Sequence, residues 1–114
     1  MRILIPLILL YISSLAQANQ CPDYTPSHQK QIDNASEVVF FASWCSSCLK
    51  SIQDSNVKNS VYIAIFDERE KAKEALAFAL GNKVKNAACF FDEKQLVGKQ
   101  FSVTNLPFVF KRKK

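Results

Sequence analysis

Histidine, methionine and long apolar runs are scarce in this sequence of 114 residues. Its one histidine is His28 and its one methionine is Met1, which disfavours a copper-type soft-metal site, because such sites usually include one of these residues. The longest apolar run, residues 3–15, is shorter than the roughly 20 residues that a helix needs to span a bilayer. Internal repeats and low-complexity tracts are also lacking. We therefore expect one small globular domain.

The N-terminus has the three parts of a secretory signal peptide. Arg2 supplies positive charge, residues 3–15 form an apolar core, and residues 16–18 place alanine at the cleavage-site positions. We expect residues 1–18 to direct export and to be removed, so that the mature protein is periplasmic or extracellular. Retention of this segment as a membrane anchor is the alternative.

The remaining composition is that of a small folded domain with a basic end. Hydrophobic residues make up 48% of the sequence and include nine phenylalanines, enough for a core. The net charge of +5 is partly concentrated in residues 111–114. A basic tail can attract acidic proteins or anionic lipid, but a solvated chain end is the commoner explanation. We do not infer a nucleic-acid partner from it.

Four cysteines follow the predicted signal peptide. An even number in an exported protein fits an oxidising compartment. Cys45 and Cys48 are the one pair with motif spacing. For Cys21 and Cys89 three alternatives are open: a structural disulfide, which we favour, two free thiols, or further redox groups. Zinc would need two more ligands with suitable spacing, which Cys21, Cys89 and His28 do not offer, so no metal site is predicted.

Strands and helices are predicted to alternate along the chain. The clearest helix covers residues 69–80, where an apolar stripe follows acidic residues and ends before Gly81. A shorter helix is expected over residues 46–54, and residues 95–101 should form a short helical or irregular connection. Short apolar runs predict strands at 38–42, 61–66, 87–91 and 106–110. This order predicts an α/β sheet with right-handed crossovers.

The residues between the signal peptide and the first strand look different. Residues 21–31 are polar and carry Pro22 and Pro26, which predicts a segment that lies over the surface without regular structure. We therefore divide the mature chain into a leader, residues 19–36, and a folded domain, residues 37–114.

Cys45 and Cys48 lie directly after a predicted buried strand and at the start of a predicted helix. Free N–H groups and the helix dipole at such a position stabilise a thiolate, and cysteines in such motifs have pKa values of roughly 3.5 to 7.5 instead of about 8.5. Cys45 is therefore the candidate nucleophile, and Cys48, one turn later and more buried, is the candidate resolving thiol. Trp44 would shield the pair and offer an apolar surface to a partner chain, with core packing as its alternative.

These features resemble the thioredoxin superfamily, and most closely its exported TlpA/ResA-like branch, over residues 37–110. The segment Phe-Phe-Ala-Ser-Trp-Cys-Ser-Ser-Cys at 40–48 resembles the strand and active-site turn of that family, and Val-Thr-Asn-Leu-Pro at 103–107 is similar to its cis-proline loop. The resemblance implies a thioredoxin-like mixed sheet flanked by helices. It also implies that backbone near Leu106 and Pro107 pairs with a bound peptide.

The function that the resemblance implies is an enzymatic one. It is that of a thiol:disulfide oxidoreductase with protein thiols and disulfides as substrates, and no cofactor is expected. The TlpA/ResA-like branch favours a reductase that receives electrons from a membrane partner. An oxidase or isomerase, or a non-catalytic binding module, remains the alternative.

Several features depart from the family pattern. Proton transfer at Cys48 lacks an obvious carboxylate, so Asp67 or water is the candidate substitute. The final strand and helix of the family have no counterpart, so we expect a sheet truncated at the C-terminus, with one edge exposed or covered by the leader or a partner. The departing residues are Ser46 and Ser47 for the usual Gly-Pro or Pro-rich pair, Val39 for a buried acid, Ser51 for a glutamate, and Phe108 for a threonine.

Overall fold

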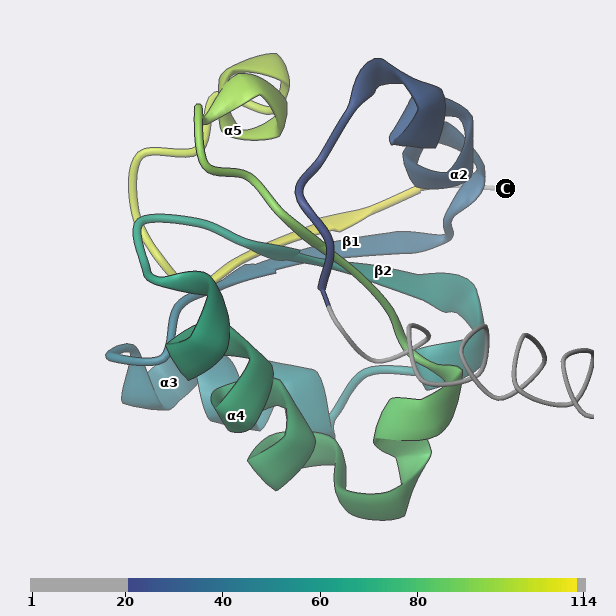
Figure 1. Cartoon of the computed structure of the whole chain (residues 1–114). Coiled ribbons are helices and arrows are strands. Elements are labelled where there is room, and N and C mark those ends of the chain that lie inside the picture. The colour runs from purple at the N-terminus through teal and green to yellow at the C-terminus, as the bar shows by residue number, and fades with distance from the viewer. Residues whose placement is uncertain (1–20, 113–114) are drawn as a thin grey trace, which may run out of the picture.

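Four strands form a mixed sheet at the centre of the computed structural model, which describes residues 21–112 (Figure 1). The sheet order is β3-β2-β1-β4, in which β4 is antiparallel to β1 and the other neighbours are parallel. This architecture confirms the α/β prediction and is compatible with a thioredoxin-like fold. The predicted signal peptide, residues 1–18, lies outside the described residues. The strands are β1 (Glu37–Phe41), β2 (Ser60–Ala64), β3 (Ala88–Phe91) and β4 (Phe108–Lys111).

Helices cover both faces of this sheet. In Figure 1, α3 and α4 lie on one face, and α2 and α5 lie on the other. Residues 21–112 also contain three 3-10 helices. The α-helices are α2 (Gln29–Asn34), α3 (Ser46–Gln53), α4 (Arg69–Leu80) and α5 (Leu96–Gln100), and the 3-10 helices are η2 (Pro26–His28), η3 (Val57–Asn59) and η4 (Gly81–Asn86).

The central strand β1 is buried on both of its faces. Val39 and Phe41 join the core cluster beneath α3 and α4, whereas Val38 and Phe40 join the cluster beneath α2 and α5. None of the four side chains is exposed. Such double burial explains why this stretch of sequence is continuously apolar instead of alternating.

The predicted elements agree with the structure to within two residues at each end. The helix predicted over residues 69–80 has those bounds, with Ala72, Leu76 and Leu80 buried against the sheet and Gly81 following its end. Gly81 has a φ of 59°, a left-handed conformation that glycine adopts without steric cost.

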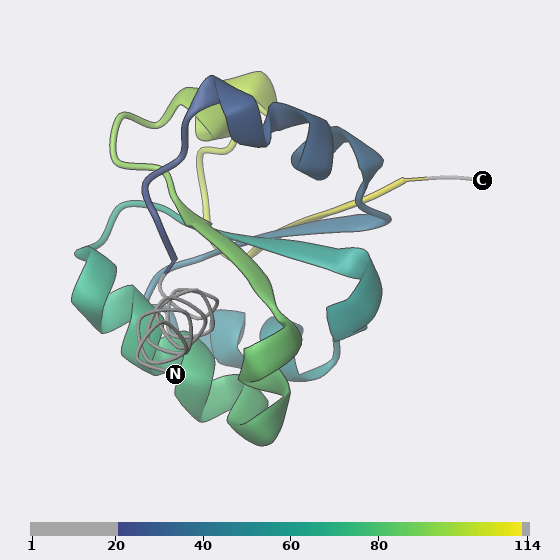
Figure 2. The ribbon, with the colours of Figure 1, turned by 45° about the vertical axis from the view of Figure 1, so that its right-hand side comes forward.

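The prediction that residues 21–31 lack regular structure is wrong. The helices η2 and α2 form here, and Ile32 is completely buried. Before them, the chain pairs with the outer edge of β3, because Tyr24 N donates to Phe91 O and Phe91 N donates to Pro22 O, both at 2.8 Å. Figure 2 shows this first segment beside β3. The segment that was expected to be a loose leader therefore covers part of one sheet edge.

A disulfide fastens this segment to the sheet. Cys21 is joined to Cys89 of β3, and the two side chains are only 1% and 7% exposed. The bond connects two positions that are 68 residues apart in the sequence. It holds the start of the described chain against an edge strand that would otherwise present unpaired backbone groups.

Replacing Cys21 and Cys89 by alanine should lower the free energy of unfolding by about 4 kcal/mol, because the crosslink restricts a long loop in the unfolded chain. Alanine at Cys45 and Cys48 removes the same number of sulfur atoms but opens a loop with a separation of only 3 residues, so the loss should be about half as large. Urea denaturation of both double variants under non-reducing conditions measures the difference. Equal losses would contradict a stapling role for the longer link.

Candidate active site

Cys45 occupies the N-cap position of α3. The chain leaves β1 and turns, with Cys45 N donating to Ala42 O at 3.1 Å. Cys45 itself has an extended backbone, and its Sγ accepts a hydrogen bond from Cys48 N at 3.2 Å. This is the arrangement in which an N-cap side chain normally uses oxygen to accept one of the free N–H groups of the first helical turn. Here a sulfur atom takes that place.

Cys45 and Cys48 are joined as a disulfide. Cys45 is 7% exposed, whereas Cys48 is fully buried. Of the two residues, only Cys45 therefore has any surface exposed to a partner. In the reduced protein, the same Cys48 N–H and the N-terminus of α3 are placed to stabilise a thiolate on Cys45.

The surroundings of Cys48 are apolar. Cys48 belongs to the core cluster that contains Val39, Phe41 and Ile52. Among residues 21–112, the one buried carboxyl side chain is Asp92, and it lies elsewhere, accepting hydrogen bonds from backbone N–H groups at the start of α5. No carboxylate of the described chain is therefore buried beside Cys48. This agrees with the presence of valine, and not an acid, at position 39.

Asp67 holds the turn that precedes the cysteines. Its carboxylate accepts hydrogen bonds from Ser43 N at 2.6 Å and from Ser43 Oγ at 3.0 Å, and also from Glu68 N at 2.8 Å. The loop after β2 is thereby fastened to the loop after β1. These contacts give Asp67 a positioning role, while its suggested part in proton transfer at Cys48 stays a prediction. The pairing with Ser43 was missed, because nothing in the sequence links two residues 24 positions apart.

Trp44 forms an exposed apolar surface next to Cys45. Its ring is tied to the same neighbouring loop, since Nε1 donates to Phe66 O at 2.8 Å. Trp44 is 63% exposed and Phe66 is 38% exposed, so two aromatic side chains of adjacent loops face solvent near the reachable sulfur. Phe66 was also missed from sequence. An aromatic residue between a strand and an acidic residue was the one available signal.

Leu106 and Pro107 lie at the end of the sheet where β1 finishes, which is also the end that carries Cys45. The register pairs Phe108 of β4 with Phe40 of β1, so the two residues before β4 lie level with the end of β1, from which the chain continues to Cys45. The peptide bond between Leu106 and Pro107 is cis. Leu106 packs against the cluster that contains both cysteines.

Comparison with family models, curated proteins and solved structures found no match.

Other candidate ligands lie apart from this site. His28 stacks on Phe90 with 4.3 Å between ring centroids, and its Nδ1 accepts a hydrogen bond from Thr25 N at 3.1 Å. Within residues 21–112, no three histidine, cysteine, aspartate or glutamate side chains gather as a metal site. None of the helices described is long and apolar enough to cross a membrane.

Asp67→Asn should lower the free energy of unfolding by about 1 to 3 kcal/mol. The amide nitrogen cannot accept a hydrogen bond, so it would face an N–H or O–H group whose hydrogen bond the carboxylate now accepts. Glu68→Gln is the matched control, since the exposed side chain of Glu68 makes one long ion pair with Lys71 and should contribute less than about 0.5 kcal/mol. Chemical denaturation of both variants gives the comparison. A loss no larger for Asp67→Asn than for the control would refute the positioning role.

Tyr62 should make stability sensitive to alkaline pH. Burial raises the pKa of its hydroxyl above 10.0 and the negative charge of Glu37 raises it further, against hydrogen bonding with Ser55 and Ser60. The folded state therefore holds this proton more tightly than the unfolded state, so the contribution is complete below about pH 10 and is lost as pH rises through the folded pKa.

Tyr62→Phe tests this sign. At neutral pH the variant should be less stable by about 1 kcal/mol, because it lacks the hydroxyl contact with Ser55. Above about pH 10 the difference should shrink, since only the wild type must deprotonate a buried phenol on unfolding. The measurement is the free energy of unfolding of both proteins from about pH 8 to 12. If the two values fall in parallel, Tyr62 does not couple to alkaline unfolding.

Proposed function

We propose that this chain is a thiol:disulfide oxidoreductase that acts on protein disulfides through Cys45 and Cys48. The observation that carries the proposal is the position of Cys45 Sγ, which caps α3 and is the more exposed sulfur of the pair. A thiolate at such a position is both stabilised and reachable, and these are the two properties that disulfide exchange requires.

The reaction balances with the two cysteines alone. In the reduced protein, the Cys45 thiolate attacks one sulfur of a substrate disulfide, forms a mixed disulfide and releases the other substrate sulfur as a thiolate. Cys48 then gives up its proton and attacks Cys45 Sγ, which releases the second substrate sulfur. The substrate disulfide has gained two electrons, and the Cys45–Cys48 bond has formed.

Three residues are proposed to bind the substrate. Trp44 offers an exposed ring beside Cys45, and Leu106 and Pro107 precede β4 at the same sheet edge. An extended peptide that pairs with the backbone before β4 would pass next to the reachable sulfur. Because backbone pairing does not depend on side chains, such a site would accept many protein sequences.

Reduction of substrates is the favoured direction. It rests on the resemblance to the TlpA/ResA-like branch, which also suggests a membrane partner that re-reduces the disulfide. The signal-peptide pattern of residues 1–18 favours the periplasm or the cell exterior as the location of this activity. An oxidase or isomerase would use the same cysteines with a different reduction potential.

A non-catalytic binding module is the second candidate. It is favoured by the apolar setting of Cys48, where Val39 stands in place of an acid and no carboxylate of the described chain is buried alongside. Without a proton acceptor, resolution of the mixed disulfide would be slow, and the protein would hold partners instead of turning them over.

The wild-type protein should accelerate the reduction of insulin by dithiothreitol, and Cys45→Ser should abolish the acceleration, because the attacking sulfur is lost. When it is reduced beforehand and freed of dithiothreitol, Cys48→Ser should instead accumulate a mixed disulfide with insulin, since neither the resolving thiol nor the dithiol is present to cleave it. Turbidity follows the reaction, and non-reducing gel electrophoresis detects the trapped species.

The Cys21→Ala, Cys89→Ala double variant is the control, because it removes two cysteines outside the site. Wild-type protein no faster than Cys45→Ser would favour the binding module. Equilibration of the Cys45–Cys48 pair with glutathione then gives the direction: a reduction potential near about −270 mV fits a reductase, and one near about −120 mV fits an oxidase.

A further inference from the structure

Three lysines gather at the end of the sheet opposite to Cys45. Lys58 lies on η3, just before β2, and Lys83 and Lys85 lie on η4, just before β3, whereas Cys45 follows the far end of β1. Lys58 and Lys83 line one pocket, and Asn86 lines both this pocket and the adjoining one, which includes Lys85. In Figure 1, η4 and the end of β4 lie on the right, away from the loop before α3 on the left.

These lysines form no ion pair with the residues that the structure describes. Asp54 is the one acidic side chain that lines the pocket of Lys58 and Lys83, and its ion pair is with Lys50. Glu37, at the start of β1, pairs with Lys111. The surface of η3 and η4 therefore carries net positive charge.

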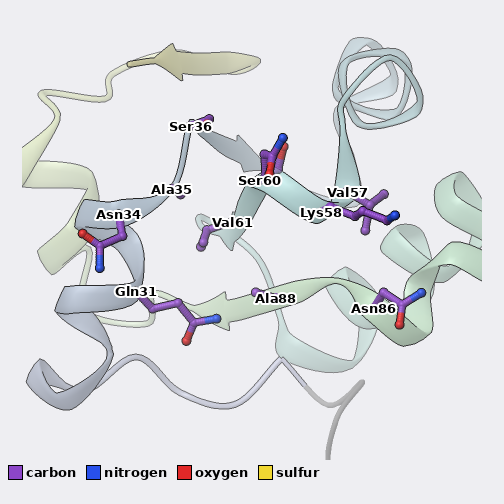
Figure 3. A pocket seen from close by; sticks show the side chains of 11 residues that line it. Gln31, Asn34, Ala35, Ser36, Val57, Lys58, Ser60, Val61, Asn86 and Ala88 are labelled. Atoms are coloured by element: carbon purple, nitrogen blue, oxygen red, sulfur yellow. The ribbon is translucent and has the colours of Figure 1, made fainter. Parts of the chain in front are cut away.

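A polar pocket of about 370 Å³ opens at the same end (Figure 3). No acidic side chain lines it. Amides, hydroxyls and one ammonium group provide hydrogen-bond donors of the kind that phosphate oxygens accept. Its polar lining comes from the side chains of Gln31, Asn34, Ser36, Lys58, Asn59, Ser60 and Asn86.

Arg112, the last residue that the structure describes, also lies at this end. Because β4 is antiparallel to β1, it finishes where β1 begins, and Arg112 N donates to Ser36 O at 2.8 Å. The guanidinium group of Arg112 bonds to the carbonyl oxygens of Ile32 and Ala35, so no carboxylate neutralises it. Lys113 and Lys114 follow in the sequence.

An exposed aromatic side chain accompanies the lysines. Phe78 lies in the last turn of α4, immediately before η4, and it is 77% exposed, more than the other exposed large hydrophobic residues described. Lysines next to an exposed aromatic ring are typical of proteins that lie on a membrane surface, where the ring enters the interface and the ammonium groups meet phosphates. An acidic protein partner would also account for the lysines, and the test below distinguishes it from lipid.

We propose that this basic end, formed by Lys58, Phe78, Lys83, Lys85 and Arg112, binds a surface of anionic phospholipid. The contact would hold the protein with Cys45 directed away from the lipid, toward protein substrates in the surrounding compartment. The membrane partner suggested above would then reach Cys45 only after the protein leaves the lipid. This inference goes beyond the proposed function, because the docking needs no cysteine chemistry.

Vesicle binding of the full chain tests the proposal. Partition coefficients are measured for vesicles of phosphatidylglycerol with phosphatidylcholine and for vesicles of phosphatidylcholine alone, at lipid concentrations where less than half of the protein is bound. Their ratio isolates the charge-dependent part from any binding by the apolar residues 3–15. Glutamine at Lys58, Lys83 and Lys85 should lower this ratio about one hundredfold, at about fivefold per charge. Added salt should lower it as well.

The matched control is glutamine at Lys71, Lys94 and Lys99, which changes the net charge equally but lies on other parts of the fold. It should alter the ratio less than about fivefold, and Phe78→Ala should weaken binding to the anionic vesicles. Equal effects of the two triple variants, or a ratio near 1 for the wild type, would overturn the proposal. Lysine-dependent binding of polyglutamate without preference for anionic vesicles would overturn it in favour of an acidic protein partner.

The orientation has its own readout. Trp44 is the chain's one tryptophan and lies at the opposite end of the sheet. Brominated phospholipids quench tryptophan only at close range, so the emission of bound protein should stay unchanged. Strong quenching of Trp44 would place the cysteine end on the lipid and contradict the inferred docking.

Discussion

The first turn of α3 is held to Cys45 through Cys48 N, which donates a hydrogen bond to Cys45 Sγ at 3.2 Å and one to Cys45 O at 3.0 Å. A helix N-terminus needs acceptors for its first N–H groups, and here the acceptor is also the reachable sulfur. Were the helix to begin one residue later, Ser46 would take the capping position and Cys45 would lose this contact. The helix boundary thus decides which sulfur is both stabilised and reachable.

The same geometry sends Cys48 into the core. Cys48 lies one helical turn after Cys45. Its side chain belongs to a cluster of aliphatic and aromatic residues from the sheet and the helices. An apolar environment disfavours a thiolate, so Cys48 should remain a neutral thiol until Cys45 is engaged in a mixed disulfide. Because this cluster includes Val39 and no acid, the proton of Cys48 would leave through water or through the departing sulfur in the proposed reaction. Such an order of events would keep the reduced pair from reacting at the buried sulfur first.

Sequence reasoning succeeded where several local signals agree, and it failed where distant backbone groups meet. The helix over residues 69–80 was predicted to the residue, because periodicity, acidic residues and Gly81 agree. The helix α2 was missed because it is only six residues long and buries one side chain, Ile32, so it shows no period. Pairing of residues 22–24 with β3 was foreseen only as one option for the sheet edge, since backbone hydrogen bonds leave no trace in side-chain pattern.

The candidate site was predicted from sequence only in its local part. Cys45, Cys48 and Trp44 are neighbours in the chain, and the helix that follows them explains their arrangement. The contacts of Ser43 with Asp67 and of Trp44 with Phe66 depend instead on β1 and β2 being adjacent and parallel. Periodicity can place each strand, but it cannot tell which loop residues will meet.

Strand direction then explains why the Cys45–Cys48 pair and the lysines lie at opposite ends of the molecule. Parallel strands finish at one edge, so the loops after β1, β2 and β3 bring Cys45, Asp67 and Asp92 to that edge. The turns that lead into β2 and β3 collect at the other edge and carry lysines, and the antiparallel β4 delivers Arg112 there. Because the sheet separates the two groups, the lysines contribute little to the stability of a Cys45 thiolate through solvent-screened distances. The ionisation of Cys45 therefore has to come from local groups, above all from the first turn of α3.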